Sequence, residues 1–271
     1  MRRFWPCVVV VLGLLAVEGV RGAQKFAAYP EITNKTFIDE YINAHNKHRS
    51  EVQPTASNML YMSFDLGLAK IARSWGRKCI FGHNPNRKVH PETKYRPFGE
   101  NIWRGSASSK PFNAAAAISS FNSEVKYYTY DDHTCSKVCG HYTQVVWADS
   151  YKVGCAIVYC SRAADGKRDI LQFVCNYAPT GNYRGVRPYK KGTSCSKCPE
   201  GDTCQNQLCR NSERDKERNE NYKRWNPPYE FHITCDESCV AVAVLRPLLM
   251  FVAFAAVYYL KLRYPGLNLK H

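Results

Sequence analysis

Cysteine and histidine are the residue types through which this chain could do chemistry, and their spacing limits what that chemistry is. The sequence has 13 cysteines and eight histidines. Cys7 lies in an N-terminal apolar leader. The cysteines that remain are even in number and can all pair, so none is an obvious free nucleophile. The sequence contains neither Gly-x-Ser-x-Gly nor His-Glu-x-x-His. Common signatures of serine hydrolases and zinc peptidases are therefore missing.

Two groupings of these residues could hold a metal ion. His45 and His48 lie three residues apart on an expected helix, so both rings could reach one ion. Such a pair more often forms an exposed helix face, which is the interpretation we prefer. Four cysteines crowd the segment Thr193–Cys209 and include one Cys-x-x-Cys pair. Zinc is the rival interpretation there, but the second pair is spaced differently, and we expect a small disulfide knot.

The N-terminus and the cysteine content indicate an oxidising compartment. Residues 1–22 have the charged, apolar and small-residue parts of a secretory signal peptide, and the apolar run is too short to cross a bilayer. Thirteen cysteines in 271 residues are typical of an extracellular chain. The net charge of +15 alone would suggest nucleic acid. Nucleic acid is not the usual partner in that compartment, so we expect no nucleic-acid binding.

A second apolar segment, residues 240–260, is long enough to cross a membrane as a helix. The alternative is a buried core helix. Residues 261–271 form a short basic tail, so the positive-inside rule predicts a single-pass type I membrane protein with its N-terminal part extracellular or luminal. On that side, Asn34 begins a glycosylation acceptor. Residues 211–239 form a charged linker, in which Asn211–Trp225 has no apolar period and is expected to be a solvated tether.

The segment from the leader to Tyr189 has the composition of a globular domain. Apolar residues recur at helical spacing in Asn34–Ser50 and Asp65–Cys79, and again from a helix start at Ser109 through Val125. Three later segments are rich in β-branched and aromatic residues and are expected to be strands: Thr143–Ala148, Val153–Tyr159 and Ile170–Tyr177. Helices followed by strands indicate an α+β fold rather than alternating βαβ units.

Two stretches resemble the signatures of a known family. GHYTQVVWADSYKVGCA at residues 140–156 and FVCNYAPTGNY at residues 173–183 resemble the two signatures of the CAP superfamily of cysteine-rich secretory, antigen five and pathogenesis-related proteins. The resemblance extends through AHNKHRSEV near Ala44 and through Gly99-Glu100-Asn101. It implies an α-β-α sandwich over residues 23–189 and a cysteine-rich hinge over residues 190–210. With the C-terminal span, the arrangement resembles the membrane-anchored glioma pathogenesis-related proteins.

The resemblance also implies a cleft that holds two histidines and two glutamates. The matching positions in this sequence are His83, Glu100, Glu124 and His141, whose spacing alone would not bring them together. Two neutral imidazoles suit Zn²⁺ or another divalent metal, and carboxylates can bind the metal or orient its ligands. A structural zinc site has four protein ligands. His83 and His141 are therefore expected to hold metal weakly.

The resemblance suggests how the cysteines pair, which spacing alone leaves open. The implied disulfides are Cys79–Cys160, Cys155–Cys175 and Cys135–Cys139 in the CAP domain, Cys195–Cys204 and Cys198–Cys209 in the hinge, and Cys235–Cys239 before the span.

Three functions follow from these patterns. The leading interpretation is a non-enzymatic, cell-surface CAP domain that binds an extracellular protein or lipid ligand at a cleft able to hold a divalent metal. The second is a metal-dependent hydrolase in which the same four residues activate water. The third rests on the resemblance alone and is lipid or sterol binding near the aromatic run Tyr127–Tyr130. A simpler interpretation of that run is side chains that cover a helix end.

Overall fold

The computed structural model describes residues 29–108, 110–216, 222–229 and 237–265. The predicted leader and Cys235 of the predicted Cys235–Cys239 pair lie outside these residues. The chain divides into one unit that ends at Glu230 and a second that begins at Phe231, and each is described by itself.

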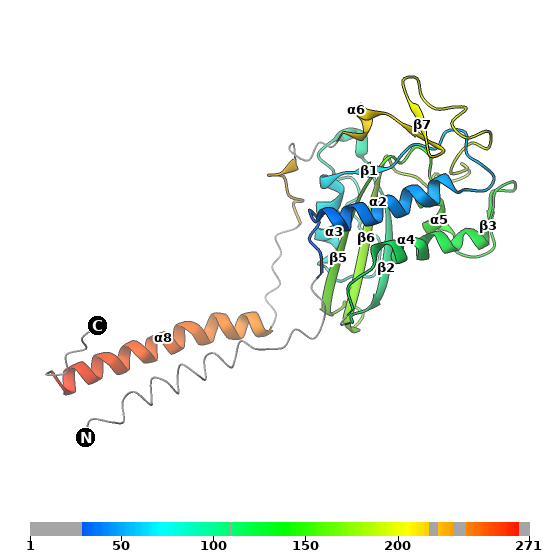
Figure 1. Ribbon diagram of the computed structural model, residues 1–271. Helices are drawn as coiled ribbons and strands as arrows, with labels where there is room; N and C mark the ends of the chain where they lie inside the picture. The colour runs from blue at the N-terminus through cyan, green and yellow to red at the C-terminus, as the bar shows by residue number, and fades with distance from the viewer. Residues whose placement is uncertain (1–28, 109, 217–221, 230–236, 266–271) are drawn as a thin grey trace. The chain divides into compact units, whose positions relative to one another are not determined.

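A four-stranded sheet forms the centre of the first unit (Figure 1). In spatial order its strands are β1 (Ser63–Phe64), β5 (Lys152–Arg162), β6 (Arg168–Ala178) and β2 (Gly99–Ser106). β5 and β6 form a long antiparallel pair in which Cys155 lies opposite Cys175. β2 pairs antiparallel with β6 and leaves its other side as an edge of the sheet. The predicted strands Val153–Tyr159 and Ile170–Tyr177 are therefore confirmed.

Helices cover both faces of this sheet. α3 (Leu66–Gly76) packs on β5 and β6, where a Cβ on Gly154 would lie 2.2 Å from a backbone nitrogen of the helix. Only glycine allows that approach. α2 (Lys35–Ser50) and α4 (Ala114–Asn122) lie on the other face, where Phe37 packs against Phe173 with ring centroids 6.2 Å apart. The predicted α-β-α sandwich is confirmed.

Side-chain caps fix where the helices begin. Asn34 accepts a hydrogen bond from the Phe37 amide, and Asp65 caps α3 in the same way, so both predicted helices are confirmed. The third begins at Ala114, later than predicted, because Asn113 provides the cap. It continues into a 3₁₀ turn, η2 (Ser123–Tyr127), rather than as α-helix through Val125.

One strand predicted from composition was wrong, and one strand was missed. The predicted strand Thr143–Ala148 is instead the short helix α5 (Gly140–Val145) and the turn after it. Its β-branched residues are buried, and the buried Arg49 guanidinium donates to the carbonyls of Val145, Trp147 and Ala148, which holds the end of the helix. Tertiary contacts therefore override local β propensity. β2 was not predicted, because its two glycines obscure the alternating pattern.

The hinge packs against the CAP domain. β7 (Thr203–Gln205) and β8 (Leu208–Arg210) form a hairpin, and Leu208 is buried in the main core. The Cys209 backbone donates to Met59 and accepts from Tyr61. The hinge thus uses the core of the larger domain in place of one of its own. The five disulfides that the resemblance implies among the described cysteines are all present: Cys79–Cys160, Cys135–Cys139, Cys155–Cys175, Cys195–Cys204 and Cys198–Cys209.

The solvated tether predicted for Asn211–Trp225 is wrong for its last part. After the short helix α6 (Ser212–Asp215), residues 222–229 pack on the CAP domain, and Tyr222 is buried in its core. We call Tyr222–Tyr229 the strap. The strap packs because it carries three aromatic residues, which can bury large apolar areas. The dense charge of the linker led to the prediction of a solvated segment.

The second unit contains one long helix, α8 (Glu237–Arg263). Within it, Ala241–Arg263 is long and apolar enough to cross a membrane. This helix is compatible with the span predicted for residues 240–260.

Candidate metal site

His83 and Glu100 form the first half of the candidate site. His83 lies in the loop after α3. The Trp75 indole holds this loop in place by donating a hydrogen bond to the Gly82 carbonyl at 2.8 Å. Glu100 lies on the edge strand β2. The His83 Nδ1 and Glu100 Oε1 atoms are 2.9 Å apart, and the Asn84 amide donates to the same oxygen at 2.9 Å. The imidazole is 57% exposed, whereas the carboxylate is fully buried.

Glu124 and His141 form the second half. Glu124 lies in η2, and its Oε1 atom is 2.7 Å from His141 Nδ1. The other carboxylate oxygen accepts the His141 backbone amide at 2.9 Å, in the first turn of α5. The His141 ring also stacks on Phe121, with centroids 5.2 Å apart and planes 11° apart. The glutamate and the aromatic ring together fix the orientation of this imidazole.

The two halves meet through Asn101. This residue follows Glu100 on β2, and its side-chain amide donates to the His141 carbonyl at 3.0 Å and to the Tyr177 hydroxyl at 3.3 Å. The structure therefore joins the four predicted residues as two His–Glu pairs, held by consecutive residues of one edge strand. Among the described residues, no hydrogen bond runs directly from one pair to the other.

The residue types of the two pairs suit a divalent metal, and among the described residues no three of their ligand atoms lie within 4.8 Å of one another. An ionised carboxylate only accepts hydrogen bonds, so each histidine carries its proton on Nδ1 and leaves the Nε2 lone pair available. This is the usual arrangement of a metal-binding histidine, in which a carboxylate orients the ring and makes it more basic. One further acceptor is present: Glu100 Oε2 is buried and has no hydrogen-bond partner among the described residues. A nearby cation would balance the charge of that oxygen and take the place of the missing hydrogen bond.

His45 is excluded as a metal ligand, contrary to the alternative raised for the His45–His48 pair. The preferred interpretation of the pair as an exposed helix face is also wrong for His45. It is fully buried, its Nδ1 atom donates to the Tyr41 carbonyl at 2.7 Å, and Nε2 accepts from the Tyr177 hydroxyl at 2.9 Å. Burial lowers the pKa of His45 to about 3, which keeps the ring neutral. His48 lies 3.2 Å from the Ser119 hydroxyl on the neighbouring helix.

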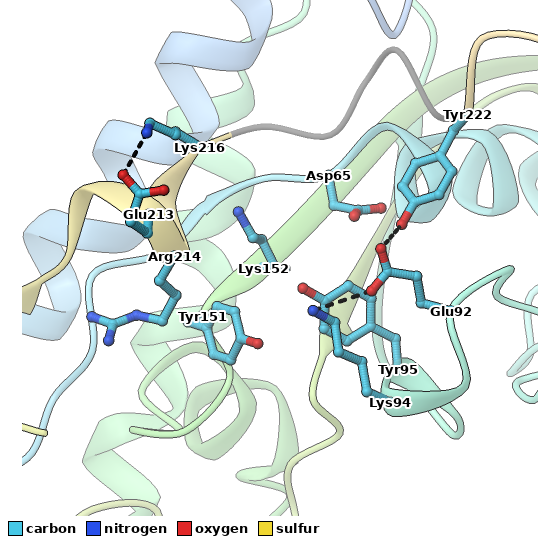
Figure 2. Close-up of a pocket in the computed structure, with 10 residues that line it drawn as sticks. All are labelled: Asp65, Glu92, Lys94, Tyr95, Tyr151, Lys152, Glu213, Arg214, Lys216 and Tyr222. Carbon is cyan, nitrogen blue, oxygen red and sulfur yellow. Dashed lines mark hydrogen bonds and ion pairs between the residues drawn. The ribbon is translucent and has the colours of Figure 1, made fainter.

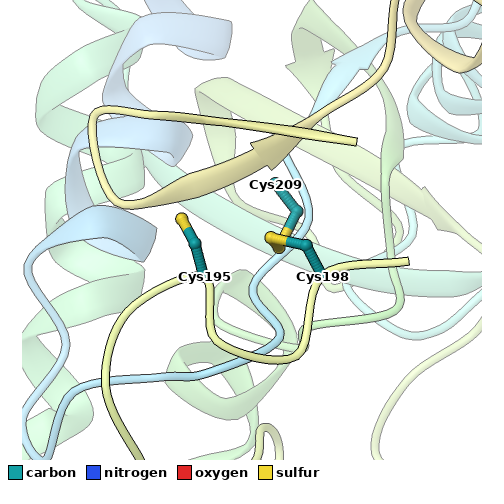
Figure 3. A group of neighbouring side chains, drawn as sticks. All are labelled: Cys195, Cys198 and Cys209. Atoms are coloured by element: carbon teal, nitrogen blue, oxygen red, sulfur yellow. A yellow bond between two sulfur atoms is a disulfide. The ribbon is translucent and has the colours of Figure 1, made fainter. Parts of the chain in front are cut away.

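The hinge cysteines do not form a zinc site in this structure. The sulfurs of Cys195, Cys198 and Cys209 lie within 4.8 Å of one another (Figure 3). They gather because two disulfides, Cys195–Cys204 and Cys198–Cys209, pack side by side. A disulfide sulfur lacks the thiolate charge that zinc requires.

A groove of about 260 Å³ lies beside the predicted aromatic run. Its walls include side chains from the strand after η2, from α5 and from the segment after β6, among them Tyr128, Trp147, Tyr183 and Val186. Burial raises the pKa of Tyr128 to about 12, so its phenol is neutral at physiological pH. Tyr183 and Val186 are exposed. Arg184 also lines the groove. The groove is therefore a surface of aromatic and apolar side chains with one cation, beside the helix that carries His141.

Two residues that matter at the site were not singled out from the sequence. Asn84 directly follows His83 and donates its backbone amide to Glu100. Asn101 directly follows Glu100 and donates its side-chain amide to the His141 carbonyl. Asn101 was visible as part of the Gly99-Glu100-Asn101 triplet. No local signal identified Asn84, whose partners come from β2 and from the strap.

The chain matches the model of the CAP family, described as the cysteine-rich secretory protein family, over residues 42–177. It is similar to GLIPR1-like protein 1 of Bos taurus, with 49% identity over 202 residues that cover 73% of this chain and 80% of that protein. It is similar to glioma pathogenesis-related protein 1 of Mus musculus, with 41% identity over 242 residues and 89% of each chain covered. It also resembles the crystal structure of NaASP2 with Zn²⁺, with a TM-score of 0.50, 26% identity, and coverage of 69% of this chain and 98% of that one.

Proposed function

The chain belongs to the CAP family of cysteine-rich secretory proteins, and we propose that it is a membrane-anchored, non-enzymatic binding protein whose two His–Glu pairs hold an exchangeable divalent metal. The proposed ligands are the Nε2 atoms of His83 and His141. Glu100 and Glu124 would orient the rings and supply negative charge. The metal would give the surface a positive centre able to bind an anionic or carbonyl group of an extracellular protein or lipid.

One observation carries the proposal: both imidazoles donate through Nδ1 to a glutamate, at 2.9 and 2.7 Å, which leaves both Nε2 atoms as potential ligands. The similarity to NaASP2, which was crystallised with Zn²⁺, supports zinc as a candidate. Two nitrogen ligands fall short of the four of a structural zinc site, so weak and reversible binding is expected.

Hydrolysis is the competing proposal, because a metal next to a carboxylate can activate water. We favour binding, since the ten cysteines of the described part of the first unit form five disulfides, and no serine hydroxyl is hydrogen-bonded to either site histidine among the described residues. The full-length chain should leave peptide libraries intact with and without zinc. Zinc-dependent cleavage that disappears in both Glu124→Gln and His141→Ala variants would replace the binding proposal with a hydrolase.

Lipid or sterol binding in the groove near Tyr128 is a second candidate, favoured by the aromatic and apolar side chains that line it. The groove's volume of about 260 Å³ is below the roughly 300–1,000 Å³ of most small-molecule pockets, so it would contact only part of a sterol. Labelled sterol should be retained by the wild-type chain and lost on Val186→Asp. Equal retention by both chains, or retention by neither, would remove this candidate.

We also propose that the CAP domain is extracellular or luminal and α8 is its anchor. Asn34 and Thr36 are exposed, as glycosylation requires. The full-length chain should stay in the membrane fraction after alkaline carbonate extraction and should shift in mobility when glycan is removed. Release by carbonate would contradict the anchor, and a chain without glycan would remove the support from Asn34.

A further inference from the structure

The strap, Tyr222–Tyr229, is bound by the CAP domain through its backbone. The ammonium group of Lys70, a buried side chain on α3, donates to the carbonyls of Tyr222, Lys223 and Trp225. A buried ammonium needs several acceptors, and this segment supplies three. Because backbone carbonyls are the acceptors, the chain must run along one path to reach Lys70.

Side chains fix the N-terminal end of the strap. The Tyr222 ring packs edge-on against the buried His90 ring, with centroids 5.5 Å apart, and the Tyr222 hydroxyl donates to the Glu92 carboxylate. Figure 2 shows this contact, with Glu92 also paired to Lys94. These contacts anchor the strap on the loop that leads to β2, and they do not include a residue of the candidate metal site.

The C-terminal end of the strap contacts the metal site through one residue. Asn84 is fully buried, and its side-chain amide donates to the Tyr229 hydroxyl at 2.9 Å. Its side-chain oxygen accepts the Asn86 amide at 2.9 Å, and its own backbone amide donates to Glu100 Oε1. That Glu100 oxygen is also the acceptor for His83. A continuous chain of hydrogen bonds therefore runs from Tyr229 through Asn84 to Glu100 and His83.

We infer that Tyr229 is a positioning residue for the His83–Glu100 half of the metal site, and that the strap couples metal binding to the segment next to the membrane anchor. This inference rests on the proposed metal function. Tyr229 closes over Asn84 and holds the loop that carries His83 against β2. With the loop held, the imidazole and the carboxylate are oriented before metal arrives, which lowers the ordering cost of binding. By linkage, bound metal must hold the strap more firmly in return.

Tyr229→Phe tests this inference, because it removes only the hydroxyl and keeps the ring. That ring packs against a small buried cluster formed by Leu68, Ile71, Tyr95, Phe98 and Ala178. Tyr222→Phe is the matched control: it also removes a strap hydroxyl, but one bonded to Glu92. Both variants are made in the full-length chain in lipid nanodiscs. The readouts are hydrogen exchange of the Asn84 amide without metal, and the zinc dissociation constant by calorimetry.

The expected result is an Asn84 amide that exchanges about fivefold faster in Tyr229→Phe, the factor for one ordinary hydrogen bond, with zinc affinity weakened by a similar factor. Tyr222→Phe should leave both values near those of the wild type. Equal effects of the two variants would show that the strap only adds general stability, and no effect of Tyr229→Phe would show that Asn84 does not need it. Either outcome overturns the inference.

A second measurement requires no change in the strap. Zinc should slow amide exchange of residues 222–229 in the wild type and not in His83→Ala. Exchange that zinc leaves unchanged in a wild type that does bind zinc would contradict the coupling. A wild type that binds no zinc at all refutes the proposed metal function instead, and the metal-free exchange of Asn84 still decides whether Tyr229 positions the loop.

Discussion

At the scale of single residues, the four site residues act as pairs. Glu100 and Glu124 each accept a hydrogen bond from a histidine Nδ1 atom. Each also accepts a hydrogen bond from a backbone amide at or next to that histidine. One carboxylate thus orients both the ring and the backbone that carries it. The identity of the four residues could be predicted from their resemblance to the CAP signatures. The pairing could not, because residue spacing does not show that residues 17 apart in the chain share a hydrogen bond.

His45 shows why a histidine cannot be assigned to metal from spacing alone. Burial lowers its pKa to about 3 in the folded protein, whereas an unfolded chain has a histidine pKa of about 6.5. Between these values the unfolded state binds more protons, so the free energy of unfolding falls as pH decreases from about 6.5 towards 3. The contribution is fully present above about pH 6.5.

His45→Gln should therefore reduce the pH dependence of stability by up to about 1.4 kcal/mol per pH unit between pH 6 and 4. Urea unfolding of both chains over this range measures the two slopes. His48→Gln, one turn away on a partly exposed position, is the control and should keep most of the wild-type slope. Identical slopes for His45→Gln and wild type would contradict the assignment of His45 as a buried neutral residue.

Asn34 has two separable roles. Its side-chain oxygen caps α2, while a glycan would be attached to the side-chain nitrogen. Asn34→Ala should remove both glycan and cap, with a loss of about 1 kcal/mol beyond any effect of the glycan. Thr36→Ala should remove the glycan and keep the cap. Thermal unfolding and gel mobility of the two variants distinguish these roles, and equal stability of the two would show that the cap contributes little.

At the scale of elements, composition predicted the regular segments and failed where packing decides the structure. α2 follows its periodicity because one face of the helix is buried, whereas α3, β5 and β6 are buried over most of their length and are correspondingly apolar. α5 has the residues of a strand, yet Arg49 and Glu124 satisfy the polar groups at its two ends. Both partners are distant in sequence, so no local window could reveal the helix. The element that carries His141 was therefore the hardest to assign.

The disulfides differ in how much they restrict the unfolded chain. Cys79–Cys160 spans 81 residues, and Cys135–Cys139 spans four. In the chain-entropy account, loss of the long loop should cost about 4 kcal/mol and loss of the short one about 2 kcal/mol. Chemical unfolding of the paired serine variants of each bridge measures the difference. A larger loss from the Cys135–Cys139 variant would contradict this order and would indicate native-state contacts specific to that loop.

At the scale of the whole molecule, the candidate metal site and the strap belong to one domain. The strap was missed in the sequence because its aromatic residues are interrupted by prolines and preceded by dense charge. Its place depends on Lys70 and Asn84, which belong to other parts of the chain. The membrane-proximal segment is thus part of the CAP domain structure, and not only a connection to α8.

Metal removal should leave this domain folded. The domain is held by the packed core between the sheet and both helical layers and by five disulfides, and all of these contacts are made by protein atoms. Chelator should therefore change the melting temperature by no more than the stabilisation expected from weak ligand binding. Differential scanning calorimetry of the full-length chain with and without chelator measures this. Unfolding by chelator would show that the site is structural.

The most direct test of the central claim is a calorimetric zinc titration of the full-length chain, its His83→Ala/His141→Ala double variant and a His133→Ala control. His133 is bonded to Tyr128 and lies outside both His–Glu pairs. The account predicts reversible zinc uptake by the wild type that weakens as pH falls, because protons compete for the imidazole nitrogens. It also predicts loss of uptake in the double variant and retention in the control. Undiminished zinc uptake by the double variant would falsify the claim.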